Sequence, residues 1–489
     1  MAWHYAFAIS GIIIPISLLY TYYRYKVTYF ERRGIPHIKS TLMNCKQQTR
    51  HLIQSAYESY KASTPIVGIF LRSTPAIVIL DLDLVKRVLI DDFTSFSDRL
   101  GGDLHENDLL HSPDNTKWQA MRKKLTPCFW SAKMAQIFPS VIKAAECLEG
   151  KSQSECVTID LKTLCTRFAA NALIYCVFGI EQDDATEPAA ALRLRINELL
   201  ERECERRITD SAKRTLAAVD CMKCTHAQAA PQKYSQLEEL VRKARMGRRA
   251  DKVSSNNILQ LIADMLADDE DERSELNQIG YELQAMHLVT RSVGTLLTGF
   301  ANAALTLMHS LRELAANEEV QRELRQEIVG VMQSYEQQFS YEAMGHMHYL
   351  DQVVAETLRK HPATELLMRR TLRAYRVPNS AYIIERGTCV LVPVYAIHHD
   401  QNIYPDPEQF DPSRFDADAV MARHACAYLS FDDGPRNCLG KRLSKMLIKV
   451  ALVTLLRCHK IAPSEEKENP IEVRVDESIS GTLVKLQRI

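Results

Sequence analysis

The longest interval without proline is the feature that most constrains how this chain can fold. No proline occurs between Pro231 and Pro362. Inside that interval, residues 285–315 carry apolar side chains three or four positions apart, which is the period of one helix face. These apolar residues are Val293, Leu296, Phe300, Ala304, Met308, Leu311 and Leu314. A helix of this length is about 45 Å long, so we expect it to cross a whole domain.

The N-terminal residues predict a membrane anchor. Residues 2–23 contain no Asp, Glu, Lys or Arg, and as a helix they would span roughly 30 Å, the thickness of the apolar core of a bilayer. The basic residues that follow are Arg24, Lys26, Arg32 and Arg33. This positive bias keeps the downstream side in the cytosol, whereas a cleaved signal peptide would carry its charges before the apolar run. We expect a transmembrane anchor over residues 1–25, with a buried N-terminal helix as the alternative.

The rest of the chain, residues 26–489, has the pattern of one large domain. Short apolar runs between turn residues predict strands, and apolar residues three or four apart predict helices. The segments predicted in this way are two strands in 64–80 with a turn at Ser73–Pro75, a helix at 115–125, strands in 389–397, a turn-rich stretch at 404–415, a helix from about 441 and a strand-like tail at 481–489. The fold class is mainly α with minor β (α+β).

Composition and missing motifs exclude several functions. The chain has 61 basic and 61 acidic residues, so no excess of positive charge indicates nucleic-acid binding. Its 13 cysteines are scattered, which favours free thiols in a reducing compartment. Cys221 and Cys224 have the spacing of half a zinc site, but no second pair lies near them, and a polar connecting segment explains them better. Motifs for dinucleotide binding, phosphate loops, α/β-hydrolases and zincin proteases are absent.

The segment "FDDGPRNCLGKRL" (431–443) carries the strongest chemical signal. Gly434 and Gly440 permit tight backbone turns and the close approach of a flat group. Cys438 lies just before a predicted helix and near cations, and both favour the thiolate, which is the form that binds metals. The nearby cations are Arg436, Lys441 and Arg442. A single cysteine in a turn is more often structural, so this signal depends on support from the rest of the chain.

Three further patterns have ordinary explanations when each is taken alone. Glu356 and Arg359 in "ETLRKHP" are three residues apart and share a helix face, as in many surface ion pairs. Trp118 and Arg122 in "WQAMR" are one helical turn apart, and Arg414 lies in "PSRF". Only their combination and order are unusual.

Together, these patterns resemble the cytochrome P450 family. The resemblance runs from the apolar anchor through W-x-x-x-R, the long helix, E-x-x-R and P-x-R-F to F-x-x-G-x-R-x-C-x-G, which is essentially the whole chain. "FSDR" (96–99), "KLTPCF" (124–129) and "YPDPEQFDPSRF" (404–415) look most like insect microsomal members. The resemblance implies a cytochrome P450-type helical fold around a buried haem b with its iron.

The resemblance also assigns roles to residues. Cys438 would bind the haem iron as the axial thiolate, which favours O–O cleavage, and Phe431 would pack near its sulfur. The residues implied to hold the haem propionates are Arg436, Trp118, Arg122 and Arg370, with Arg369 as the alternative to Arg370. Arginine suits this task because its pairing with a carboxylate can be bidentate. Glu356, Arg359 and Arg414 would form a buried structural network.

Two parts of the chain depart from the family pattern. Asp432 occupies a position that is commonly glycine, so the loop must accommodate a side chain. The central helix usually reads A/G-G-x-[D/E]-T in the family, and here Gly299 matches the glycine that lets the helix open over the haem. Ala301 replaces the acid and Asn302 replaces the threonine, while Thr306 lies one turn further on. Alanine cannot relay a proton, and asparagine has hydrogen-bonding atoms but no titratable proton.

The resemblance implies a haem-thiolate monooxygenase that inserts one oxygen atom from O2 into a lipophilic small molecule, such as a xenobiotic, a steroid or a fatty acid. Electrons would come from NADPH through NADPH-cytochrome P450 reductase, and the resemblance allows cytochrome b5 as a second partner. The implied location is the endoplasmic reticulum membrane, with the catalytic domain facing the cytosol. The altered acid–threonine pair leaves two alternatives open: a haem-thiolate peroxide isomerase or dehydratase, and a haem-binding protein with little catalysis.

Two surfaces follow from the same resemblance. A basic face for docking the reductase would consist of Lys123, Lys124, Lys441, Arg442 and Lys445. The walls of the substrate pocket would come from residues 100–115, 195–230, 293–302 and 364–368. Residues 195–230 are rich in Arg and Glu, and their helical pattern predicts that these charges face solvent.

Overall fold

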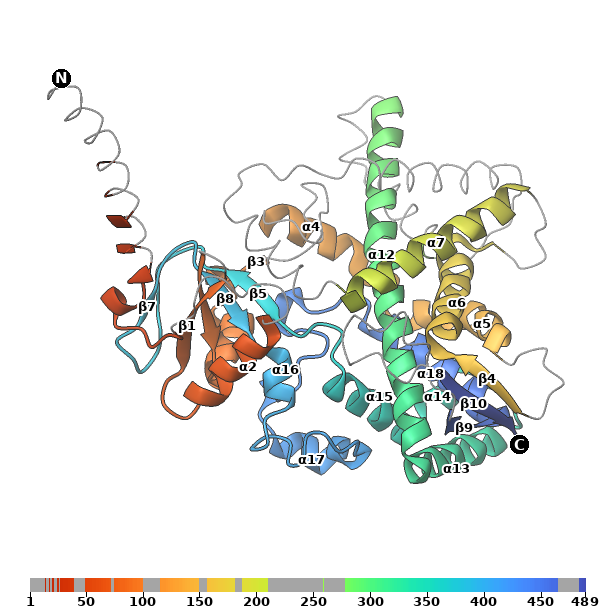
Figure 1. Ribbon diagram of the computed structural model, residues 1–489. Helices are drawn as coiled ribbons and strands as arrows, with labels where there is room; N and C mark the ends of the chain where they lie inside the picture. Colours follow the sequence, from red (N-terminus) through yellow and green to blue (C-terminus); the bar gives the residue numbers. More distant parts are fainter. Residues whose placement is uncertain are drawn as a thin grey trace, which may run out of the picture.

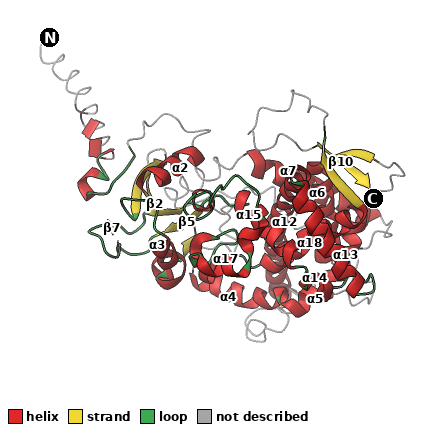
Figure 2. Cartoon of the chain, turned by 90° about the horizontal axis from the view of Figure 1, so that it is seen from below, coloured by secondary structure: helices red, strands yellow, loops and turns green. Residues whose placement is uncertain are grey.

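Strands formed by residues 66–99 and 367–392 gather at one side of the molecule, and most helices gather at the other (Figures 1 and 2). This structure is a computed structural model. It describes residues 27–38, 49–71, 74–99, 115–148, 156–180, 187–209, 278–464 and 483–489, together with Ile258 and a few single positions between 14 and 25. The expected class, mainly helical with a minor β part, is confirmed.

The helices begin and end at residues whose chemistry favours those positions. The α-helices are α2 (Thr49–Tyr60), α3 (Leu82–Lys86), α4 (Asn115–Leu125), α5 (Ser131–Ala145), α6 (Leu161–Leu173), α7 (Glu187–Thr209), α12 (Gln278–Ala316), α13 (Glu318–Ser334), α14 (Tyr341–Gly345), α15 (His348–Lys360), α16 (Val394–His398), α17 (Ala417–Ala422) and α18 (Lys441–Cys458). Asp81 caps α3 by accepting a hydrogen bond from the backbone N–H of Leu84 at 2.8 Å. Asp160 caps α6 in the same way, and such caps satisfy N–H groups that have no partner within the helix.

The strands form three small sheets. The strands are β1 (Ile66–Leu71), β2 (Thr74–Ile79), β3 (Asp98–Arg99), β4 (Cys156–Asp160), β5 (Leu367–Arg370), β6 (Tyr375–Arg376), β7 (Ile383–Ile384), β8 (Cys389–Val392), β9 (His459–Pro463) and β10 (Leu483–Arg488). The largest sheet has the order β1-β2-β8-β5-β3, and the others are β4-β10-β9 and β6-β7. In the largest sheet β2 and β8 are parallel, while β5 runs antiparallel to both β8 and β3.

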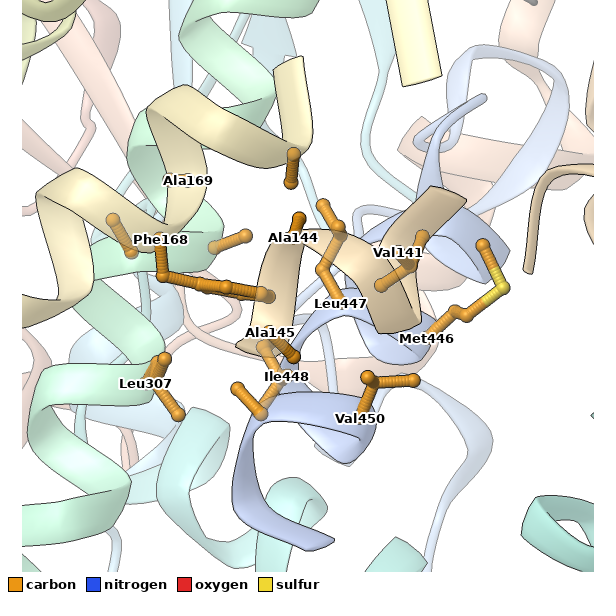
Figure 3. Close-up of a cluster of buried hydrophobic side chains, with 14 of the residues drawn as sticks. Val141, Ala144, Ala145, Phe168, Ala169, Leu307, Met446, Leu447, Ile448 and Val450 are labelled. Carbon is orange, nitrogen blue, oxygen red and sulfur yellow. The ribbon is translucent and has the colours of Figure 1, made fainter. Parts of the chain in front are cut away.

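The long helix α12 passes through the helical part of the molecule and packs against α6, α7, α15 and α18. Its buried side chains join a large cluster, called here the helical core. Figure 3 shows part of this cluster, with Leu307 of α12 among side chains of α5, α6 and α18. Each fully buried leucine or phenylalanine of this kind stabilises the fold by about 1.5–3 kcal/mol. A second cluster packs the five-stranded sheet against the loop that leads to Cys438, through residues such as Ile77, Leu89 and Leu429.

Most elements predicted from the sequence are confirmed. The central helix is longer than 285–315, the helix at 115–125 matches α4, and 64–80 contains β1 and β2. The prediction of strands in 389–397 is confirmed for β8, which ends at Val392, and is wrong for the residues after Pro393, which form the short helix α16. Proline lacks the N–H that a strand ladder needs.

The membrane anchor is not visible in the described part of the chain. No helix among the described residues combines the length and the apolar character that a membrane span needs. Most of residues 1–25 lie outside the described residues, so the anchor stays a prediction.

Candidate functional site

Cys438 lies in a loop that ends at the start of α18. The backbone N–H of Cys438 donates a hydrogen bond to the carbonyl of Phe431 at 2.8 Å, which closes the loop on itself. Gly434 has a φ of +73°, and a Cβ added to it would lie 2.0 Å from the carbonyl oxygen of Leu89, so no other residue fits there. Phe431 and Leu439 pack against the helical core. The loop is therefore anchored on both sides of its cysteine.

The sulfur of Cys438 is enclosed on some sides and open on another. The side chain is exposed to solvent, yet burial is the main cause that raises the pKa of its thiol. The backbone N–H of Gly440 and the guanidinium groups of Arg99 and Arg122 act in the opposite direction, but they do not outweigh burial. Burial therefore opposes the thiolate that the neighbouring cations favour. A bound metal ion would itself deprotonate the thiol.

Arg436 is buried against Trp118 beside this loop. Its side chain is 2% exposed, and its guanidinium carbon lies 4.2 Å from the centre of the Trp118 ring. Burial, followed by repulsion from Arg99 and Arg369, lowers the pKa of Arg436 to about 10. Trp118 and Arg436, which are both expected to hold the propionates, therefore contact each other. Arg99, the last residue of "FSDR", was not recognised from the sequence as part of it.

Arg122 holds the residue next to the cysteine. Its Nη1 donates to the carbonyl of Asn437 at 2.6 Å, and its Nη2 donates to the Asn437 side-chain oxygen at 2.5 Å. Trp118 lies one turn earlier on α4, so both residues of the W-x-x-x-R pattern contact the Cys438 loop.

The two neighbouring arginines of β5 point in different directions, as successive strand residues do. Arg369 is 1% exposed, and its Nη2 donates to both carboxylate oxygens of Asp432 at 2.8 and 2.9 Å. Its Nε is buried and has no hydrogen-bond partner among the described residues. Arg370 pairs instead with Asp98, with 2.5 Å between Nε and Oδ2. The structure places Arg369, rather than the expected Arg370, against the Cys438 loop.

Asp432 accommodates its side chain in the loop by making this ion pair. Its φ is +60°, a left-handed conformation that few residues other than glycine adopt easily, aspartate among them. Besides pairing with Arg369, its Oδ1 accepts a hydrogen bond from the backbone N–H of Asp433 at 2.8 Å. The aspartate therefore replaces the usual glycine with a buried charge pair.

These residues fit a haem. The open side of Cys438 provides a sulfur for the iron, and four arginines gather beside it from separate elements. They are Arg99, Arg122, Arg369 and Arg436. Among the described residues, Asp98 and Asp432 are the carboxylates that oppose this charge at Arg436. Guanidinium groups gathered from several elements and the buried Nε of Arg369 suit a ligand with carboxylate groups.

The Glu356–Arg359–Arg414 network is present and buried. Arg359 donates to Glu356 through Nε at 2.7 Å and Nη2 at 2.8 Å, and both side chains are 0% exposed. The Nε of Arg414 lies 3.5 Å from Glu356 Oε1. Arg359 also donates to the carbonyls of His398 and Pro407 at 2.9 and 2.7 Å. The network ties α15 to the turn-rich segment that precedes Cys438.

His398 extends this network to the cysteine loop, and no pattern in the sequence indicates this role. It is 0% exposed, and burial lowers its pKa to about 3, so its imidazole is neutral. Its Nε2 accepts a hydrogen bond from the backbone N–H of Leu429 at 2.9 Å. Its Nδ1 then carries the proton and donates to the carbonyl of Arg359 at 3.1 Å. One imidazole thereby joins α15 to the approach to Cys438.

One face of α12 is open along the segment that departs from the family pattern. Thr298, Gly299, Asn302 and Leu305 are half-exposed, while the residues between them, Ala301 included, are buried. Within the part of the chain that the structure describes, no atom beyond its chain neighbours and its own helix backbone lies within 4 Å of a Cβ added to Gly299. Gly299 and Asn302 therefore share the open face, and Ala301 does not.

Thr306 does not replace the missing threonine. It is 3% exposed, and its hydroxyl donates to the carbonyl of Asn302 at 2.9 Å within the same helix.

The charges of α7 do not all face solvent, contrary to expectation. Glu203 is 3% exposed and lies against α12, where Arg207 donates to Asn302 at 2.6 Å. The periodicity of a helix predicts a polar face but not which neighbouring element covers it. The other parts of the predicted pocket wall, residues 100–114 and 210–230, lie outside the described residues, as do Cys221 and Cys224.

The predicted basic face is only partly available. Lys123, Lys441 and Arg442 are exposed, whereas Lys124 and Lys445 are half-buried. Lys445 pairs with Asp351 at 3.0 Å.

The cysteines within the described ranges are free. No cluster of three or more metal-binding side chains occurs in that part of the chain.

The sequence is similar to known proteins over nearly its whole length. The sequence model of the family described as Cytochrome P450 matches residues 35–482. A Drosophila melanogaster protein described as probable cytochrome P450 6a13 is 33% identical over 466 residues, which cover 93% of this chain and 92% of that protein. Cytochrome P450 6k1 of Blattella germanica is 30% identical over 503 residues (97% and 95% covered). Cytochrome P450 6A1 of Musca domestica is 30% identical over 506 residues (98% and 96% covered). The predicted similarity to insect members is confirmed.

Proposed function

The chain belongs to the cytochrome P450 family of haem-thiolate monooxygenases, and from this premise we propose that it inserts one oxygen atom from O2 into a lipophilic small molecule. The observation that carries the proposal is the surrounding of Cys438. A sulfur open on one side lies beside four arginines that come from separate elements. This combination suits one ligand that offers both a metal ion and carboxylates.

The cofactor in this proposal is haem b. Cys438 binds the iron, and Phe431, half-buried beside the loop, packs near the sulfur. The haem, when bound, supplies the iron centre at which dioxygen is reduced. The propionates are held by Arg436, Trp118, Arg122, Arg369 and Arg99, where Arg369 takes the role first given to Arg370. Glu356, Arg359 and Arg414 keep the loop in place and do not touch the reacting atoms.

The substrate meets the open face of α12. On that face, the polar atoms of Thr298 and Asn302 lie beside the half-buried side chain of Leu305. Ligand sites commonly combine apolar walls with a few polar groups of this kind. Gly299 lets a ligand approach the helix backbone closely. This arrangement supports a lipophilic substrate without selecting among xenobiotics, steroids and fatty acids.

One observation favours a second candidate function. Reduction of dioxygen consumes protons, and the usual acid and hydroxyl are replaced by buried Ala301 and by Asn302. A substrate that already contains an O–O bond needs no proton relay. The second candidate is therefore a haem-thiolate peroxide isomerase or dehydratase.

The electron donor in this proposal is NADPH-cytochrome P450 reductase, with cytochrome b5 as a second donor. Lys441 and Arg442 lie at the start of α18, directly after the Cys438 loop, and Lys123 lies on α4. These exposed cations support docking of an acidic partner. We further propose that residues 1–25 anchor the domain formed by residues 26–489 to the endoplasmic reticulum membrane. The charge-free run of residues 2–23 and the basic residues after it support this location.

The two candidates differ in what they consume. The purified protein is mixed with reductase and NADPH, or with a lipid hydroperoxide alone, over a panel of lipophilic compounds. Consumption of NADPH matched by oxygenated product supports the proposal. Turnover of the hydroperoxide without NADPH, and no NADPH-dependent product, would instead establish the second candidate.

A further inference from the structure

Glu203 is a buried carboxylate on α7 that the reaction outlined above does not use. Its side chain is 2% exposed. Arg206 donates to it at 2.8 Å, the Nε of Arg207 lies 3.2 Å from its Oε1, and the hydroxyl of Thr298 on α12 lies 3.3 Å from the same oxygen. A buried charge needs such partners to remain in the fold. The carboxylate is thus held between its own helix and the open face of α12.

Arg207 connects this carboxylate to Asn302. Its Nε donates to Glu203, and its Nη1 donates to the side-chain oxygen of Asn302 at 2.6 Å. Thr298 and Asn302 are four residues apart, so they lie one above the other on the same helix face. Both polar residues of the open face are therefore contacted by one acid–arginine pair from another helix.

We propose that Glu203 and Arg207 form a positioning pair for the oxygen-handling face of α12, in place of the acid that Ala301 lacks. This inference rests on the proposed function. With its oxygen held by Arg207, Asn302 presents its amide N–H groups away from α7, toward a ligand on the open face. The hydroxyl of Thr298 donates its hydrogen bond to Glu203, so the lone pairs of its oxygen remain available to a ligand on the open face.

This arrangement can hold a water molecule for proton transfer, which the methyl group of Ala301 cannot do. A water on the open face would find a donor in Asn302 Nδ2 and an acceptor in Thr298 Oγ1, and ordered waters need such multiple partners. Glu203 acts as an acceptor between two guanidinium groups, so its role is to orient its neighbours and not to give up a proton. Proton transfer then passes through water that these two side chains hold.

The neighbouring acid on the same helix shows that this contact is not a general property of α7. Glu205 lies two residues further on, is 59% exposed and faces Lys162 at 3.3 Å. It provides a matched control, because Glu205→Gln removes the same charge from the outer side of the helix. Arg206→Gln is a second control, since Arg206 contacts Glu203 but not Asn302.

The test is the stretching frequency of carbon monoxide bound to the reduced protein, because it responds to donors near the ligand and needs no known substrate. We expect Arg207→Gln and Glu203→Gln to shift this frequency in the same direction as Asn302→Ala. We also expect these two variants to raise the hydrogen peroxide released per NADPH, and to lower the matched product by about tenfold, less than the loss of a direct proton donor. Glu205→Gln and Arg206→Gln should have the carbon monoxide frequency of the wild type. The frequency of Arg207→Lys should lie between those of the wild type and Arg207→Gln.

The outcomes separate the inference from the function beneath it. A wild-type protein without the Soret band of thiolate-ligated haem under carbon monoxide would overturn the proposed function itself. A normal wild-type band, with frequencies unchanged in Arg207→Gln and Arg207→Lys, would overturn the inference alone. So would a shift in Arg206→Gln as large as that in Arg207→Gln, because the effect would then come from the charge of Glu203 and not from Asn302.

Discussion

Nη2 of Arg369 donates to both carboxylate oxygens of Asp432, at 2.8 and 2.9 Å, inside the loop that carries Cys438. The two side chains are 1% and 4% exposed. A position where glycine is usual thus carries a charge that neutralises a buried arginine. The pair links β5 of the sheet directly to the cysteine loop.

Asp432→Asn should destabilise the protein markedly. Asparagine tolerates the φ of +60°, so the change isolates the loss of charge and leaves Arg369 buried without its partner. Breaking such a pair costs about 3–5 kcal/mol, to be measured as the free energy of unfolding in denaturant. Glu319→Gln is the control, because its pair with Arg322 is exposed on both sides and is worth less than about 1 kcal/mol. Equal effects of the two changes would contradict the structural role given to Asp432.

Glu356→Gln should be at least as damaging. Glu356 accepts two hydrogen bonds from Arg359 and one from the backbone N–H of Asp411 at 3.1 Å, and it also faces Arg414. The substitution leaves two arginines without their shared carboxylate, a loss of about 3–5 kcal/mol. The loss of stability is measured as the midpoint of chemical unfolding, and its effect on the cysteine loop as the haem content after purification. Retention of haem with an unchanged midpoint would show that the network does not hold the loop.

His398 should make the protein sensitive to acid. Burial lowers the pKa of His398 to about 3 and that of His399 to about 4, whereas both titrate near pH 6.5 when unfolded. The unfolded chain therefore binds more protons between these values, and the free energy of unfolding falls as the pH drops from 7 to 4. The slope contributed by each histidine reaches about 1.4 kcal/mol per pH unit.

The variant His398→Gln checks this explanation. Its plot of unfolding free energy against pH should be shallower between pH 7 and 4 than that of the wild type. His348→Gln, at an exposed position, should leave the slope unchanged. An identical slope in all three proteins would mean that His398 does not carry the acid sensitivity.

The parts of the molecule that were predictable depend on local sequence. α12 and α4 follow from apolar periodicity, and Cys438 and Glu356 lie in short patterns that become informative through their combination and order along the chain. His398 has no such pattern, because its importance comes from two backbone partners, at residues 359 and 429, that are distant in the sequence.

Choices between neighbours required the tertiary structure. Arg369 and Arg370 are equivalent in sequence, and only the register of β5 beside β8 and β3 decides which one reaches the loop. Glu203 and Glu205 lie on the same helix and carry the same charge, but α12 covers only the side of α7 on which Glu203 lies.

Restoring the usual acid and hydroxyl should raise coupled turnover. In the double variant Ala301→Asp with Asn302→Thr, the loss of Asn302 frees Nη1 of Arg207 to pair with the new carboxylate on the face toward α7. We expect product formed per NADPH to rise by up to about tenfold, within the range that positioned proton-handling groups contribute. Unchanged coupling in this variant would mean that the missing pair does not limit the reaction.

The most direct test of the whole account is the absorption spectrum of the reduced protein under carbon monoxide, compared with that of Cys438→Ser. The wild type should show the Soret band of thiolate-ligated haem, and Cys438→Ser should lack it while keeping the folded state in circular dichroism. Cys156→Ser, which changes an exposed cysteine of β4, should keep the band. A thiolate-type band that persists in Cys438→Ser, or that is absent from the wild type, would contradict the assignment of Cys438 as the haem ligand.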